Sequence, residues 1–129
     1  MARRRTDPSA GHEALETWRR DPAAAGRPQL ATAVRWALEE LAERAPGNAV
    51  EVRVPPLGVT QCVPGPRHTR GTPPNVVETD PQTWLALVVG ELSWPEAVSS
   101  GRVVASGLRT DLSTWLPLLA PRRPGSVAP

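Results

Sequence analysis

Three stretches of the sequence hold side chains that could do chemistry. The first is H-E-A-L-E over residues 12–16, which has the spacing of a zinc-binding helix but carries Glu16 where the second His would be needed. We interpret it as the solvated surface of a short helix. The second is Cys62, which can act as a nucleophile only where a neighbouring cation or base lowers its pKa. A single Cys within a strand is more often a small buried side chain, and we favour that interpretation.

The third stretch is R-H-T-R over residues 67–70, in a loop rich in Pro and Gly. Two Arg side chains beside a His could hold a carboxylate or phosphate group, and loops of this kind often carry functional residues on a rigid scaffold. The alternative is a polar loop whose Arg side chains pair with surface acids such as Glu78. The sequence has no glycine-rich phosphate loop, serine nucleophile motif or close carboxylate pair. We therefore expect no catalytic residues, no cofactor and no metal site.

Two helices are expected in the first third of the chain. Apolar residues recur at helical spacing along one side of Leu30–Ala45, with charged residues on the other side. Residues 10–20 could form a shorter helix that carries Leu15 and Trp18 on one side.

Four strands can be placed by their patterns. Val alternates with charged residues over residues 50–54, which predicts a half-buried strand. The connection to residues 59–63 is too short for a crossover, so the return strand should be antiparallel. Residues 75–79 and 102–106 predict two more strands, the last because of its β-branched residues.

Two further helices are expected between the last two strands. Asp80 is a good N-cap, and six apolar residues follow from Trp84 to Val89. A helix that is apolar all round is buried, and Gly90 can end it in a left-handed conformation. Ser93 and Glu96 have the spacing of a capping box for a second, short helix.

The order of the elements predicts the fold class. Asp111 can cap a last short helix through Trp115 and Leu116, which Pro117 breaks. Helices and strands then occur in separate clusters along the chain, and this order predicts an α+β fold with a mainly antiparallel sheet.

The charge of the chain argues against nucleic acid as a partner. The 129 residues suit one domain, with 15 basic residues, all of them Arg, against 13 acidic ones. Residues 29–119 hold nine acidic residues and seven Arg, so the basic surplus lies in residues 1–28 and 120–129. Nucleic-acid binding needs cations clustered on the folded face.

The same residues indicate a location and a domain plan. Cys62 is the single Cys, which excludes an internal disulfide and fits a reducing cytosol. No apolar segment follows Arg3–Arg5 as in a signal peptide, and no run approaches the ~18 apolar residues of a membrane span. We expect a cytoplasmic protein with an N-terminal tail over 1–28 that can hold a short helix, a domain over 29–119 and a C-terminal tail over 120–129.

Residues 83–112 resemble the C-terminal half of sterol carrier protein domains. That half consists of an apolar helix, a short helix, a strand and a closing helix, separated by small residues. The span 30–119 fits the order of elements in that family, and it is most similar to the small bacterial branch, including the loop over residues 65–80. The matching small residues here are Gly90, Ala97, Gly101 and Gly107.

The resemblance implies a curved, four- to five-stranded sheet covered on one side by helices. It also implies a hydrophobic tunnel for fatty acyl chains, sterols or phospholipids, without cofactor or covalent chemistry. A ligand head group could meet Arg67, His68 or Arg70 at the mouth. The residues that would line the tunnel are Trp84, Leu85, Val88, Leu92, Val98, Val103, Leu112, Leu116 and Leu119.

Lipid transport is therefore the function that the resemblance implies, with an apolar small molecule as partner and transient contact with membranes. The alternative is an accessory or interaction domain related to the C-terminal domain of mycothiol-dependent maleylpyruvate isomerase-like enzymes. In those enzymes the metal site belongs to a separate helical N-terminal domain, which residues 1–28 are too short to form. A third interpretation is an interaction module whose basic tails recruit acidic surfaces.

Overall fold

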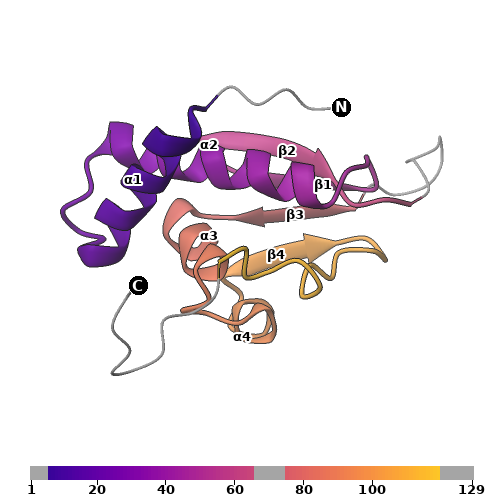
Figure 1. The fold of residues 1–129 in the computed structure, drawn as a ribbon. Helices are drawn as coiled ribbons and strands as arrows, with labels where there is room; N and C mark the ends of the chain where they lie inside the picture. Colours follow the sequence, from indigo (N-terminus) through magenta and orange to yellow (C-terminus); the bar gives the residue numbers. More distant parts are fainter. Residues whose placement is uncertain (1–5, 66–74, 120–129) are drawn as a thin grey trace.

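The computed structural model describes residues 6–65 and 75–119. Helices and strands are both present, and the expected α+β class is confirmed (Figure 1). In chain order the elements are α1 (Pro8–Arg20), α2 (Arg27–Arg44), β1 (Val50–Val54), β2 (Gly58–Cys62), β3 (Val76–Thr79), α3 (Pro81–Val88), α4 (Trp94–Ser99) and β4 (Val103–Ser106).

The sheet is mixed, so the expectation of a mainly antiparallel sheet is wrong. The strand order is β2-β1-β3-β4, and the central pair, β1 with β3, is parallel. The two outer pairs are antiparallel. The hairpin geometry of β1 and β2 fixes only their own pairing, and β3 then pairs with the other edge of β1. Within the described residues the sheet has four strands, not five.

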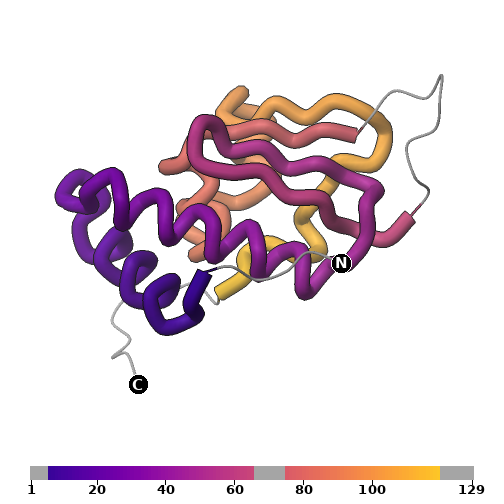
Figure 2. The backbone as a smooth tube through the Cα atoms, turned by 90° about the horizontal axis from the view of Figure 1, so that it is seen from above, coloured from indigo at the N-terminus to yellow at the C-terminus, as the bar shows by residue number. Residues whose placement is uncertain are grey.

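The helices cover one face of this sheet (Figures 1 and 2). Val50, Val52 and Val54 of β1 are buried on that face, whereas Arg53 between them is exposed on the other. This alternation follows from the two-residue period of a strand. The second face of the sheet is left without a covering layer in the described structure.

The capping residues act as expected between β3 and β4. The Asp80 carboxylate accepts a hydrogen bond from the Thr83 backbone N–H at 2.8 Å and begins α3. Gly90, with φ of +78°, follows the end of α3 in the left-handed conformation that favours glycine. Ser93 and Glu96 form the capping box of α4.

The short N-terminal helix forms, and it belongs to the same core as the rest of the chain. Leu15 and Trp18 of α1 are buried, and the Trp18 indole N–H donates to the Gln82 side-chain oxygen at 2.7 Å. A Cβ atom added at Gly11 would lie 2.3 Å from Cγ of Trp36 on α2. The absence of a side chain at Gly11 therefore lets the two helices come close together.

The last helix, expected from Asp111, is absent. Residues 113–115 form a single turn, in which the Ser113 backbone N–H donates to the Asp111 carboxylate at 2.9 Å. Pro117 has no N–H and cannot continue a helix that would be only a few residues long. We call residues 108–119 the C-terminal strap, because they cross the helical layer without regular structure.

Candidate functional site

An apolar cleft of about 290 Å³ lies between the end of α3, the start of α4 and the C-terminal strap. It is open to solvent on one side. Of the nine described residues that line it, six have apolar side chains: Leu87, Leu92, Trp94, Pro95, Leu116 and Pro117. The others are Gly90, Ser93 and Ser113.

Local backbone structure holds the cleft open between α3 and α4. The backbone N–H groups of Glu91 and Leu92 both donate to the Ala86 carbonyl, at 3.0 and 3.3 Å. Together with the turn at Gly90, these bonds direct the chain away from α3 before α4 begins. Trp94 at the first position of α4 forms a wall of the cleft, and only 9% of it is exposed.

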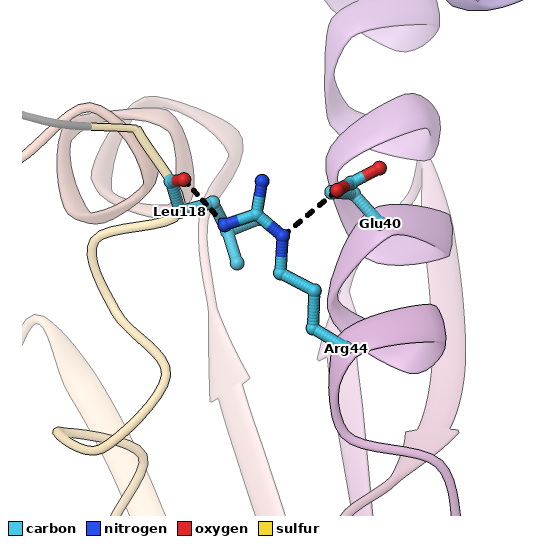
Figure 3. A network of polar contacts seen from close by, with 3 residues as sticks. All are labelled: Glu40, Arg44 and Leu118. Carbon is cyan, nitrogen blue, oxygen red and sulfur yellow. Dashed lines mark hydrogen bonds and ion pairs between the residues drawn. The ribbon is translucent and has the colours of Figure 1, made fainter.

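The C-terminal strap forms the opposite wall. The backbone N–H groups of Leu118 and Leu119 donate to the Val88 carbonyl at 3.0 and 3.1 Å. The Arg44 guanidinium donates to the Leu118 carbonyl and also pairs with Glu40 at 2.8 Å (Figure 3). The strap is thus fixed both to α3 and to the end of α2.

Of the nine residues predicted to line a tunnel, the structure brings Leu92 and Leu116 to the cleft. Five others are buried in the core, with exposed fractions of 3% or less: Trp84, Leu85, Val88, Val103 and Leu112. Val98 is 42% exposed on α4 and Leu119 is half-buried. Arg67, His68 and Arg70 lie outside the described residues.

Sequence reasoning missed Leu87, Trp94, Pro95 and Pro117. Leu87 belongs to the apolar run that predicted a buried helix, but burial all round gives no sign of which side meets a cleft. A better signal was the S-W-P sequence at residues 93–95. Directly after the N-cap Ser93, this Trp stands where the chain enters α4 from the turn after α3.

The nucleophile and metal candidates give the site no chemistry. Cys62 is fully buried, and burial raises the pKa of its thiol to about 12. His12 is exposed, and its ring packs edge-on against Trp36 with the ring centroids 4.6 Å apart. In the described part of the chain, no three His, Cys, Asp or Glu side chains are grouped so that they could hold a metal ion.

The one titratable group with a shifted pKa near α3 has a capping role. Partial burial raises the pKa of Asp80, but hydrogen bonds from the Thr83 backbone and hydroxyl outweigh it and lower the pKa overall. The cleft itself is lined by no titratable side chain of the described residues. Its two serines are partly occupied, since the Ser93 hydroxyl donates to Glu96 at 2.8 Å. This lining suits an apolar ligand.

A second, larger cavity of about 400 Å³ lies where α2 turns into β1. Its lining includes Asn48, Glu51, Thr60 and Gln61, so it is much more polar than the cleft. Burying an acyl chain there would remove these groups from water without giving them partners.

Comparison with known proteins points to one family. The model of the family described as "Bacterial SCP ortholog" matches residues 26–118. A search of curated proteins finds no match. None of the described helices combines the length and the apolar character that crossing a membrane requires.

Proposed function

The chain belongs to the bacterial SCP ortholog family, as its resemblance to sterol carrier protein domains predicted, and we propose that it is a non-catalytic carrier of single-chain lipids. The family gives the general role, the binding of apolar molecules. The observation that carries the proposal in this chain is the apolar cleft between α3, α4 and the C-terminal strap.

Hydrophobic burial is the driving force that this cleft offers. Each methylene group removed from water contributes about 0.8 kcal/mol, before the cost of ordering the ligand. Among the described lining residues, the two serine hydroxyls and the Trp94 indole N–H are the polar side-chain groups, so this part of the lining has little with which to orient a polar group. We therefore assign it to the tail of a ligand.

The size of the cleft favours a short or medium acyl chain over a sterol or a two-chain phospholipid. Small-molecule sites usually measure about 300–1,000 Å³. A cleft of about 290 Å³ lies just below that range. Decanoic acid is a suitable first ligand because it has one flexible, unbranched chain.

Arg67, His68 and Arg70 are our candidates for binding the ligand carboxylate. The reason is their chemistry: guanidinium groups bind carboxylates in a bidentate manner, and none of the described residues of the cleft lining is a cation. The double variant Arg67→Gln/Arg70→Gln should weaken binding of decanoic acid more than binding of decanol. Equal effects on both ligands, or no effect on either, would remove this assignment.

The decisive experiment combines extraction with fluorescence titration. Organic extracts of the purified protein should contain fatty acids by mass spectrometry. The chain has five Trp and no Tyr or Phe, so protein emission reports on Trp alone. Decanoic acid should change the emission, and most of that change should disappear in Trp94→Phe, whose indole is at the cleft wall.

A matched pair of variants tests the location. Leu92→Phe should fill part of the cleft, whereas Val98→Phe adds the same side chain at an exposed position of α4. The Phe side chain in Leu92→Phe should occupy the space of about two methylene groups of decanoic acid. Losing their burial corresponds to about tenfold weaker binding. Val98→Phe should bind as the wild type does. No lipid in the extracts together with no emission change would contradict the carrier function and favour the accessory-domain alternative.

A further inference from the structure

We call the side of the sheet that no described element covers the open face, and it carries two rows of side chains across the four strands. The strand registers place Val59, Arg53, Glu78 and Val104 next to one another in the first row. The second row consists of Gln61, Glu51, Val76 and Ser106.

The first row has an ordered pattern, apolar, positive, negative, apolar. Val59 and Val104 at its ends are 58% and 65% exposed. Arg53 pairs with Glu51 of the second row at 2.7 Å. Glu78 has no ion-pair partner among the residues that the structure describes.

This pattern is self-complementary under one particular symmetry. Consider a second copy packed face to face, related by a two-fold axis that runs parallel to the strands between β1 and β3. The axis reverses the order of the row, so that Val59 lies opposite the partner's Val104 and Arg53 opposite the partner's Glu78. The four central charges then alternate in sign around a square, and each has two neighbours of opposite charge.

The other simple arrangement is unfavourable. A two-fold axis at right angles to the strands, through the first row, would place Arg53 opposite the partner's Arg53 and Glu78 opposite the partner's Glu78. Like charges at such distances repel. Both arrangements keep the strands of the two sheets nearly aligned, as in a sandwich, and the charges select the first.

We propose that the open face is the interface of a symmetric dimer of this chain. Both copies use the same surface, as a two-fold interface requires. The Arg53–Glu78 pairs set the orientation, and Val59 with Val104 lose exposed apolar surface at both edges. The cleft lies on the helical side, so it stays accessible in this dimer.

The area of the face sets the expected strength. Four strands about 4.8 Å apart, with four or five residues of about 3.3 Å each, span roughly 300 Å² in plan. Stable complexes bury about 800 Å² on each partner, so we expect a weak dimer with a dissociation constant of roughly 100 µM.

Charge reversal gives a sharp test, because one change should break the dimer and two should restore it. Arg53→Glu makes all four central charges negative, and Glu78→Arg makes them all positive. Either variant should weaken the dimer at least about tenfold in sedimentation experiments from about 10 µM to about 1 mM. The double variant Arg53→Glu/Glu78→Arg recreates the alternating square and should dimerise nearly as well as the wild type.

Two controls separate the interface from general charge effects and from folding. Glu13→Arg/Arg20→Glu exchanges the same charges on the exposed side of α1 and should leave dimerisation unchanged. In the double open-face variant, the carboxylate introduced by Arg53→Glu lies beside Glu51 of the same copy and repels it. Because this repulsion acts within one copy, it should lower thermal stability more than it changes the dissociation constant of the dimer. Thermal unfolding of the variant is therefore measured separately.

A third variant tests the apolar ends of the row. Val104→Asp places a charge opposite the partner's Val59 and should also weaken the dimer at least about tenfold, without unfolding the monomer, because the side chain is largely exposed. The proposal is overturned if the wild type sediments as a monomer at every concentration. It is equally overturned by a dimer that ignores both charge reversals, which would indicate edge-to-edge pairing of strands.

Discussion

At the contact of α1 with α2, Gly11 lets the indole of Trp36 lie directly against a helix backbone. After α3, by contrast, the turn at Gly90 places the indole of Trp94 beside an open cleft. We call α1, α2, β1 and β2 the packed half of the molecule, and α3, α4 and the C-terminal strap the cleft half. The same two residue types meet in close contact at Gly11 and Trp36, whereas at Gly90 and Trp94 they border the cleft. The difference comes from the backbone, which is a regular helix at Gly11 and a left-handed turn at Gly90.

Thiol reactivity should separate the two halves most strongly. Cys62 in the packed half has a pKa raised to about 12, so very little thiolate exists at pH 8. Leu92→Cys would place a thiol of ordinary pKa at the cleft, and the difference in ionisation alone predicts about a thousandfold faster reaction. An aromatic disulfide reagent should therefore react in two phases with this variant.

The pH dependence of the slow phase gives the control. Its rate should keep rising above pH 9, because burial keeps the Cys62 thiol protonated there. The folded-state pKa is raised above the unfolded one, so the stability that Cys62 contributes is present below pH 9 and is lost as pH rises toward 12. The chain has no Lys or Tyr to titrate in this range. Equal rates for both thiols would show that the packed half is open to solvent.

Shortening matched Leu residues should give the next largest difference. Leu41 on α2 is fully buried, and Leu41→Ala should lower the free energy of unfolding by about 3 kcal/mol through lost burial and the cavity it leaves. Leu92→Ala removes the same atoms from a half-buried cleft wall and should cost about 1 kcal/mol or less. Chemical denaturation measures both, and similar losses would mean that the cleft wall is as tightly packed as the core.

The Gly11 contact can be tested by adding volume. Gly11→Val places atoms where Trp36 already lies, and overpacking of this kind costs about 2 kcal/mol. Ala10→Val, one residue earlier on the exposed side of α1, adds two methyl groups without a clash. Thermal unfolding should show a clearly lower midpoint for the first variant only. If both behave alike, α1 does not pack closely against α2.

These two halves also differ in how far the sequence predicts them. Local signals were sufficient for α2, whose apolar stripe is regular, and for α3 and α4, whose caps at Asp80 and Ser93 form as expected. The parallel pairing of β1 with β3 was not predicted, because no short-range signal records which strand pairs with the free edge of a hairpin. The Trp18 indole N–H bonds to Gln82, 64 residues away, and the sequence around Trp18 contains no sign of that partner.

The residues of the candidate site were harder to predict from the sequence than the helices and strands. The apolar run Trp84–Val89 predicted burial, and the structure buries most of it. Which apolar residues face the cleft depends instead on the turn at Gly90 and on a strap that packs without regular structure. Leu92 and Leu116 were among the predicted residues, whereas Leu87 and Trp94 were not. Hydrophobicity marks residues that leave water, and it does not distinguish a side chain in the core from one beside a ligand.

Arg44 links the two halves, and its replacement should give the smallest effect. Arg44→Ala removes the hydrogen bond to the Leu118 carbonyl and the ion pair with Glu40. The Arg44 side chain is 42% exposed, so global unfolding should change by about 1 kcal/mol or less. The local effect should be clearer: the amides of Leu118 and Leu119, which bond to Val88, should exchange hydrogen about five times faster, because the strap opens more often.

Arg44→Lys is the matched control, because it keeps the charge near Glu40 but loses the planar fork that binds both partners at once. Faster exchange in Arg44→Ala with intermediate exchange in Arg44→Lys would establish the carbonyl bond as a tether of the strap, and unchanged exchange in both would show that the strap is held without Arg44.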